Sequence, residues 1–230
     1  MKLRALIGIF VAIIVPVTFF IYFDGRGVPH RPKLKRFIAL ETGDTQPNSI
    51  KIKDTLWHTI PPFSFTAQTG KVVTEKDVKG KIVVADFFFT KCAGICPKMT
   101  SQLTRVQKTF KDYPDVRILS HTVDPERDDV PTLRQYADTY GADSTKWWLL
   151  TGDKKAIYDQ ARHGYFVTAT EGDGGAEDFI HTEKFILIDP DGVIRGYYDG
   201  TDSVAVDKLM GDIVVLQIEF PKDKKLILKR

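Results

Sequence analysis

Two cysteines, Cys92 and Cys96, are the residues whose type and spacing point to chemistry in this chain. They stand four positions apart, between an apolar run at residues 81–89 and a predicted helix start at Pro97. Residues four apart on a helix lie about 6 Å apart along its axis, which falls within the Cα separation of a disulfide. The pair could therefore close into a disulfide or hold one metal ion, and Gly94 gives the loop the freedom to turn both sulfurs inward.

The position of the pair predicts reactive thiols. A helix N-terminus lowers the pKa of a nearby thiol, and we expect Lys91 and Lys98 to lower it further. Two thiolates do not complete the four-coordinate site that zinc prefers, but with one more donor they suit a soft ion such as Cu(I). Two structural cysteines in a core are the plain alternative. We set it aside because these are the only cysteines and they flank a glycine at a strand-to-helix junction.

A third metal donor would come from one of five histidines, which are His30, His58, His121, His163 and His181. Position favours His181, because it follows a glycine-rich segment at residues 171–175 and directly precedes a predicted strand. Loops at strand ends gather around the site in sheets of this kind. His121 is second, although a histidine inside a strand is by default a buried structural residue.

The hydrophobic pattern predicts a mixed sheet. Residues 81–89 are apolar except for Lys81 and Asp86, which is typical of a central strand buried on both faces. Further strands are expected at 63–65, 71–74, 116–123, 147–150, 184–188 and 193–198, and helices at 97–112, 131–141, 153–164 and 203–219. Asp153 and Ser203 are the expected caps of the last two helices. The order βββαβαβαββα implies a thioredoxin-like α/β fold with helices on both faces of the sheet.

The N-terminus predicts a membrane anchor. Residues 5–23 carry no charge and would span about 28 Å as a helix, close to the thickness of a bilayer core. A cleaved signal peptide is the alternative, but the run is longer than its apolar region and no small-residue cleavage site follows. We expect an anchor at 1–23, a linker at 24–60, a thioredoxin-like domain at 61–220 and a basic tail at 221–230.

The composition limits the classes of protein and partner that fit this chain. The formal net charge is only +3, and 43% of the residues are hydrophobic, so a disordered chain and a nucleic-acid-binding protein are both disfavoured. The basic residues near the anchor do not decide its orientation by count. We place the domain outside the cytosol, since long domains translocate with little regard to charge and the cysteine chemistry suits that compartment.

Three blocks in order resemble the SCO/SenC family, whose members are thioredoxin-like copper-binding proteins that help to assemble cytochrome c oxidase. They are FFFTKCAGICP at 87–97, VDPERD at 123–128 and the stretch from His181 to Gly192, which contains IDPDG. The resemblance covers about residues 55–220. It implies a soluble domain on the periplasmic side of a bacterial inner membrane, or in the intermembrane space if the protein is mitochondrial.

The resemblance also implies the site. One copper ion, as Cu(I) or Cu(II), would be held by Cys92, Cys96 and His181 and delivered to the copper-site subunit of the oxidase. Many relatives have Pro and Asp after the first cysteine, where this chain has Ala93 and Gly94. Relatives often have an acid before the histidine, and here that position is Ile180.

Two functions fit the same pair of sulfurs. The first is a membrane-anchored metallochaperone, which is not an enzyme and which gives up copper by ligand exchange. The alternative is a thiol–disulfide oxidoreductase that keeps the oxidase's copper-binding cysteines reduced, with Cys92 and Cys96 as the redox pair. Thioredoxin-type oxidoreductases resemble one another in a proline before the strand facing the cysteines, and residues 132–189 contain no proline. That favours the copper function.

Overall fold

The computed structural model describes residues 33–40, 56–167 and 182–221. Within these ranges, no helix is both long enough and apolar enough to cross a membrane. The expected anchor, most of the expected linker, His181 and residues 222–230 lie outside the described residues. The domain described below belongs to a single compact unit that begins at Leu34.

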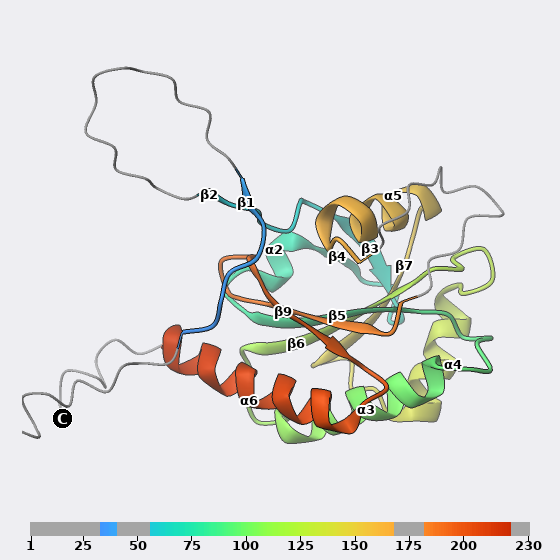
Figure 1. Cartoon of the computed structure of the whole chain (residues 1–230). Coiled ribbons are helices and arrows are strands. Elements are labelled where there is room, and N and C mark those ends of the chain that lie inside the picture. Colours follow the sequence, from blue (N-terminus) through green and yellow to red (C-terminus); the bar gives the residue numbers. More distant parts are fainter. Residues whose placement is uncertain (1–32, 41–55, 168–181, 222–230) are drawn as a thin grey trace, which may run out of the picture. The chain divides into compact units, whose positions relative to one another are not determined.

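A seven-stranded mixed sheet forms the centre of this unit (Figure 1). Across the sheet the strands are β4 (Val72–Thr74), β3 (Ser64–Ala67), β7 (Trp147–Thr151), β6 (Val116–Thr122), β5 (Ile82–Phe88), β8 (Lys184–Ile188) and β9 (Ile194–Asp199). The three central strands β5, β6 and β7 are parallel, whereas β3 and β8 pair antiparallel to their neighbours. All seven residues of β5 are buried, which confirms the predicted central strand.

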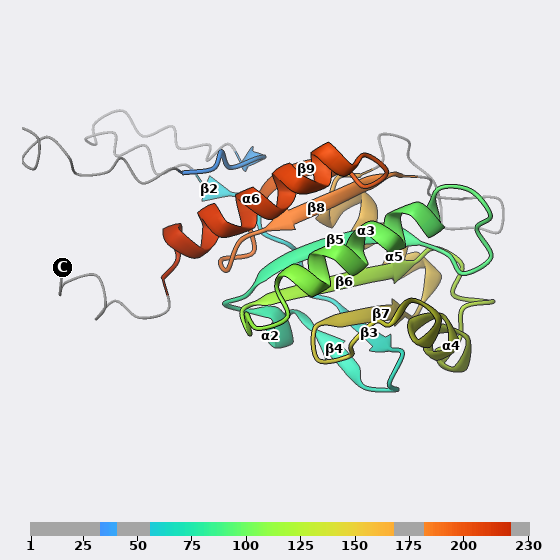
Figure 2. The same ribbon diagram turned by 90° about the horizontal axis from the view of Figure 1, so that it is seen from below.

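Helices cover both faces of the sheet (Figure 2). One face packs against α3 (Cys96–Thr109), α4 (Val130–Tyr140) and α6 (Ser203–Glu219). The other face packs against α5 (Lys154–Asp159) and the π-helical turn η1 (Gln160–Gly164) that continues it. A short helix, α2 (Glu75–Val78), was not predicted, because four residues are too few to show a helical period.

The amphipathic pattern of α3 explains why it packs where it does. Met99, Leu103 and Val106 recur at helical spacing and are fully buried against the sheet. Burial of such side chains contributes about 1.5–3 kcal/mol each. Trp147 and Trp148 point to opposite faces of β7, as their adjacent positions in a strand predict.

The helix starts follow local sequence, with one correction. The Asp153 side chain accepts a hydrogen bond from the Ala156 N–H and caps α5 as predicted. The prediction that Ser203 caps α6 was wrong. The cap is Asp202, whose carboxylate accepts from the Val204 N–H at 3.0 Å, and Ser203 is the first helical residue. The carboxylate one position earlier satisfies a free amide of the first helical turn.

Part of the expected linker contacts the domain. The short strands β1 (Ala39–Leu40) and β2 (Leu56–Trp57) pair antiparallel, and the Phe37 N–H donates to the Ile194 carbonyl. The buried guanidinium of Arg195 donates to the backbone carbonyls of residues 34 and 35 and pairs with Asp189 and Glu219 at 2.9 and 2.7 Å. Arg195 therefore ties the chain near Leu34 to the end of β8 and the end of α6.

Candidate metal centre

The cysteine pair lies where the central strand β5 passes into helix α3. A tight turn follows the strand, closed by the Cys92 N–H donating to the Phe89 carbonyl at 3.2 Å. Cys96 is the first residue of α3 and Pro97 follows it, where its missing N–H leaves no intrahelical bond unmade. Both cysteines are free thiols; Cys92 is half-buried in the turn and Cys96 is buried in the core.

The Cys92 sulfur is the more acidic of the two. Burial works to raise the pKa of this thiol, but hydrogen bonds from the Cys96 thiol and from the backbone N–H groups of Cys96, Gly94 and Ile95 outweigh it and lower the pKa. Backbone N–H groups at the start of a helix favour a negative charge. The expectation that a helix start makes a reactive thiolate therefore holds for Cys92, with backbone amides and the neighbouring thiol as the lowering groups.

The expectation of a lowered pKa was wrong for Cys96. Burial, together with its hydrogen bond to Cys92, raises the pKa of the Cys96 thiol to about 12. The physical reason is that Cys96 packs into the apolar core beside α3, where a charge is poorly solvated. The pair is thus asymmetric, with one accessible acidic thiol and one buried thiol that holds its proton.

The structure gives His121 the structural role expected by default. It is fully buried on β6, opposite Phe87, and its Nε2 lies 3.2 Å from the hydroxyl of Tyr165. Burial lowers the pKa of His121 to about 3, so its ring is neutral. It packs with the aromatic residues of the α5 face, whereas Cys96 packs on the opposite face of the sheet. His121 is therefore not placed to join the cysteines.

Two other histidines are also described. The Nε2 of His58 donates to the Gly164 carbonyl at 3.0 Å, and its ring stacks edge-on against Phe166. His163 is exposed in the last turn of the η1 segment. His30 and His181 lie outside the described residues. Among the described side chains, no three His, Cys, Asp or Glu residues come together as a metal-binding group.

The topology brings the start of β8 to the cysteine end of β5. Val83 pairs with Ile188 and Ala85 with Ile186, so the antiparallel register carries Lys184, the first residue of β8, to the level of Phe87. The chain just before β8 therefore reaches the end of the sheet from which the cysteine turn emerges.

A buried carboxyl on β5 was missed by the sequence analysis. Asp86 is 2% exposed and accepts a hydrogen bond from the Ser120 hydroxyl, which in turn accepts from the indole N–H of Trp147. Burial raises the pKa of Asp86 to about 7, and its charge contributes to raising the pKa of Cys96. A single acid inside an otherwise apolar run was the available signal.

The loop after β6 lies beside the cysteine turn. It forms a turn with an ion pair, because Arg127 contacts the Asp124 carboxylate at 3.3 Å and donates its backbone N–H to the Asp124 carbonyl. The last residue of the same motif, Asp128, is fully buried and reaches across to Thr90. Asp128 was not among the predicted site residues.

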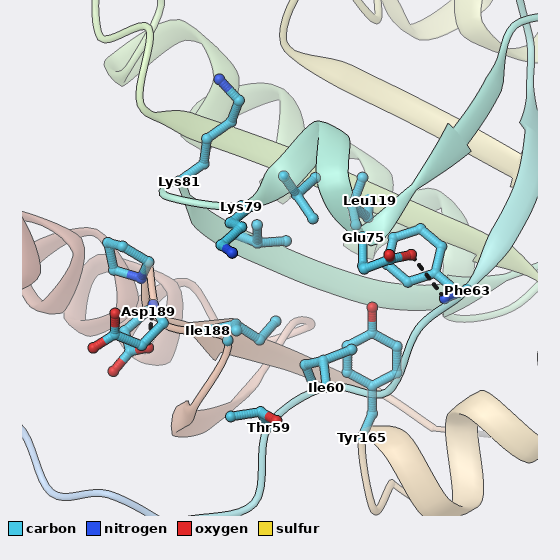
Figure 3. A pocket seen from close by; sticks show the side chains of 15 residues that line it. Thr59, Ile60, Phe63, Glu75, Lys79, Lys81, Leu119, Tyr165, Ile188 and Asp189 are labelled. Carbon is cyan, nitrogen blue, oxygen red and sulfur yellow. Dashed lines mark hydrogen bonds between the residues drawn. The ribbon is translucent and has the colours of Figure 1, made fainter.

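A pocket of about 280 Å³ lies at the other end of β5 (Figure 3). Its lining includes Val83 and Leu119 from the sheet, Ile188 from the end of β8 and the hydroxyl of Tyr165. Neither cysteine lines it. The chemistry of the cysteine pair is therefore located on a partly exposed turn, away from this pocket.

The fold and the site together define a thioredoxin-like protein with a Cys-x3-Cys pair at the junction of a central strand and a helix. The sequence model of the SCO1/SenC family matches residues 54–214, and this chain belongs to that family. The family resemblance of the sequence motifs is thereby confirmed.

Individual relatives agree with this assignment. The SCO1 protein homolog of Bacillus subtilis is 35% identical over 164 residues, spanning 71% of this chain and 85% of that protein. A structure of BsSco, described as a member of the Sco family of cytochrome c oxidase assembly proteins with a disulfide switch, superposes with a TM-score of 0.60 at 35% identity. The match covers 73% of this chain and 98% of that one.

A further similar structure is Arabidopsis thaliana ScoI, described with copper bound. It is 29% identical, with a TM-score of 0.55, and the match covers 68% of this chain and 98% of that one. These likenesses confirm the predicted thioredoxin-like α/β architecture with a mixed sheet flanked by helices.

Proposed function

We propose that this chain binds copper and takes part in the assembly of cytochrome c oxidase. The observation that carries the proposal is the Cys92 sulfur, which is held by N–H groups at the start of α3 next to the buried thiol of Cys96. Membership of the SCO1/SenC family supports it, as do the oxidase assembly role stated for BsSco and the copper bound to Arabidopsis thaliana ScoI.

The proposed ligands are the sulfurs of Cys92 and Cys96 and the ring of His181, with one copper ion per chain. Two thiolates and an imidazole form a soft, low-coordinate set that suits Cu(I) better than zinc. His181 stands three residues before Lys184, and the register of β8 carries Lys184 to the cysteine end of β5. That register supports His181 over His121, whose ring packs on the other face of the sheet.

The chemistry of the two thiols suits a copper ion that is first bound and then released to another protein. Binding requires both thiols to lose their protons, which Cys92 does readily and Cys96 does only when a metal replaces its proton. The partly exposed turn lets thiols of an acceptor protein reach the metal and displace its ligands one at a time. The proposed acceptor is the copper-site subunit of the oxidase.

We further propose that residues 5–23 anchor the chain with the domain outside the cytosol. An anchor would raise the effective concentration of the domain near a membrane-bound oxidase. Fusions of a periplasmic reporter and a cytosolic reporter to the C-terminus test this orientation. Activity of the cytosolic reporter alone would overturn it.

Copper titration of the purified full chain tests the metal function. We expect one copper per chain, with binding lost or at least tenfold weaker in Cys92→Ser, Cys96→Ser and His181→Ala, since each removes a ligand. His163→Ala, an exposed histidine elsewhere in the fold, is the matched control and should bind as the wild type does. Unchanged binding in His181→Ala would remove the third ligand, and no binding by the wild type would overturn the copper function.

The asymmetry of the two thiols supports thiol–disulfide exchange as a second candidate. In such exchange one accessible thiolate attacks a disulfide and releases one of the substrate's thiols. The second protein thiol then attacks the protein sulfur of the mixed disulfide, releases the other substrate thiol and closes the protein disulfide. Cys92 fits the first role and Cys96 the second. Two results with copper-free protein would favour this function. His181→Ala should reduce a disulfide-bonded peptide at the wild-type rate, and Cys96→Ser should be trapped as the mixed disulfide with that peptide. Absence of any trapped species would exclude it.

A further inference from the structure

Asp128 is a buried carboxylate at the border between the loop after β6 and the cysteine turn. It is fully buried and both of its oxygens accept hydrogen bonds. Oδ2 accepts from the Thr90 backbone N–H at 3.1 Å and from the Thr122 hydroxyl at 2.5 Å. Oδ1 accepts from the Thr90 hydroxyl. A buried carboxylate is costly unless it is hydrogen-bonded, and here neutral donors satisfy it.

The loop after β6 holds Asp128 firmly on its own side. The Asp128 N–H donates to the Asp124 carbonyl at 2.9 Å, and the Asp124 N–H donates to the Thr122 hydroxyl at 3.0 Å. The Val123 N–H continues the pairing of the two strands by donating to the Phe88 carbonyl. The carboxylate therefore projects from a fixed loop.

On the other side, Asp128 holds the turn that carries the half-buried Cys92. Thr90 lies two residues before Cys92, and the turn is closed by the Cys92 N–H donating to Phe89. Cys96 is fixed by its helix and its core contacts, so the distance between the two sulfurs depends on this turn. Thr90 is bound through both its amide and its hydroxyl, which restrains the position and the rotation of that residue.

We propose that Asp128 is a positioning residue for the metal centre, holding Thr90 so that Cys92 meets Cys96 and the amides at the start of α3. The inference rests on the proposed copper function. It explains why an acceptor stands here, because the Thr90 backbone N–H can only donate, and the Thr122 hydroxyl, which accepts from the Asp124 N–H, donates its own hydrogen to Asp128. Partners that orient metal ligands in this way are worth roughly 10- to 100-fold in metal affinity.

The test compares the full chain with Asp128→Asn and Thr90→Val, using Asp129→Asn as the control. Asp129 is the exposed neighbour that caps α4 by accepting from the Thr132 N–H. Asparagine keeps that acceptor, so Asp129→Asn makes the same charge change without touching the turn. We expect Cu(I) affinity, measured by competition with a chromophoric chelator, to fall roughly 10-fold or more in Asp128→Asn. Thr90→Val should lose less, since its backbone amide still donates, and Asp129→Asn should bind as the wild type does.

A second readout separates positioning from general destabilisation and needs no copper. The pH at which Cys92 alkylation by iodoacetamide is half-maximal should rise by about half a unit or more in Asp128→Asn and Thr90→Val, because a loosened turn weakens the hydrogen bonds to the thiolate. It should not move in Asp129→Asn. If Asp128→Asn does not fold, Thr90→Val still supplies both measurements.

The outcomes are distinguishable. Wild-type affinity and an unshifted alkylation profile in both variants would overturn the role of Asp128 while leaving the copper function standing. Equal losses of affinity in Asp129→Asn would likewise overturn it, as they would show that losing a negative charge near the turn is enough, without any contact to Thr90. A wild type that binds no copper but shows the shifted profile in the two variants would overturn the copper function and keep Asp128 as the residue that positions Cys92.

Discussion

Two buried titratable groups should oppose each other in the pH dependence of stability. Asp86 is 2% exposed, and burial raises its pKa from 3.8 to about 7, against a lowering by its hydrogen bond from Ser120. His121 is fully buried, and burial lowers its pKa from 6.5 to about 3. Between about pH 4 and 6.5 the folded chain therefore keeps the proton on Asp86 and leaves His121 neutral, whereas the unfolded chain does the reverse.

The sign follows from proton counting. The raised pKa of Asp86 stabilises the fold fully below pH 3.8, and this contribution is lost as the pH rises toward 7. The lowered pKa of His121 acts oppositely, because its contribution is present above pH 6.5 and is lost as the pH falls toward 3. Each contribution changes by about 1.4 kcal/mol per pH unit, so in the wild type they nearly cancel from about pH 4.5 to 6.

Replacing one of these two groups should reveal the pH dependence that the other group contributes to stability. We expect the free energy of unfolding of Asp86→Asn, relative to that of the wild type, to rise by about 1.4 kcal/mol per pH unit between pH 4.5 and 6. His121→Phe, which keeps an aromatic ring beside Phe87, should show a fall of the same size. Urea unfolding followed by tryptophan fluorescence at three pH values measures both slopes. The double variant should run parallel to the wild type.

A pH-independent difference between Asp86→Asn and the wild type would refute this reasoning. It would show that Asp86 is ionised in the folded state despite its burial. The same result in His121→Phe would show that the ring is protonated in the aromatic cluster, or that water reaches it.

Three further predictions concern other parts of the molecule. At pH 7.5, Cys92 should react with iodoacetamide at least tenfold faster than Cys96, because the pKa of Cys92 is lowered whereas Cys96 is buried and its pKa is raised. Peptide mass spectrometry measures both rates, and equal rates would contradict the asymmetry. Arg195→Met should lower the free energy of unfolding by about 3–5 kcal/mol, since it leaves the buried carboxylate of Asp189 and the partly buried one of Glu219 without their partner. Urea unfolding that finds a loss below about 1 kcal/mol would show that water replaces the guanidinium. Gly200→Ala should lower the free energy of unfolding by about 1–3 kcal/mol, because the new Cβ would lie 2.6 Å from the fully buried ring of Phe185. An unchanged melting temperature would show that the ring can move.

Local patterns predicted most of the fold. The apolar run of β5, the two tryptophans on opposite faces of β7 and the cap at Asp153 could all be read from neighbouring residues, since strand period and capping are short-range properties. The errors were also local. Asp202, and not the predicted Ser203, caps α6, and the four-residue helix α2 is too short to show a period.

The chain of amino acids alone determined which chemistry this protein can carry, because the only two thiols stand at a strand-to-helix junction whose signals are all nearby. It also determined the order of the strands along the chain, whereas the antiparallel pairing that brings the start of β8 to the cysteine end of β5 is a property of the folded sheet. Only the tertiary structure decided that the two thiols differ, with Cys92 made acidic by amides and Cys96 kept protonated by the core. Likewise, the hydrogen bonds between Asp128 and Thr90 join residues that are 38 positions apart in the sequence. Burial and such distant contacts depend on how the strands pack, and no pattern of adjacent residues contains that information.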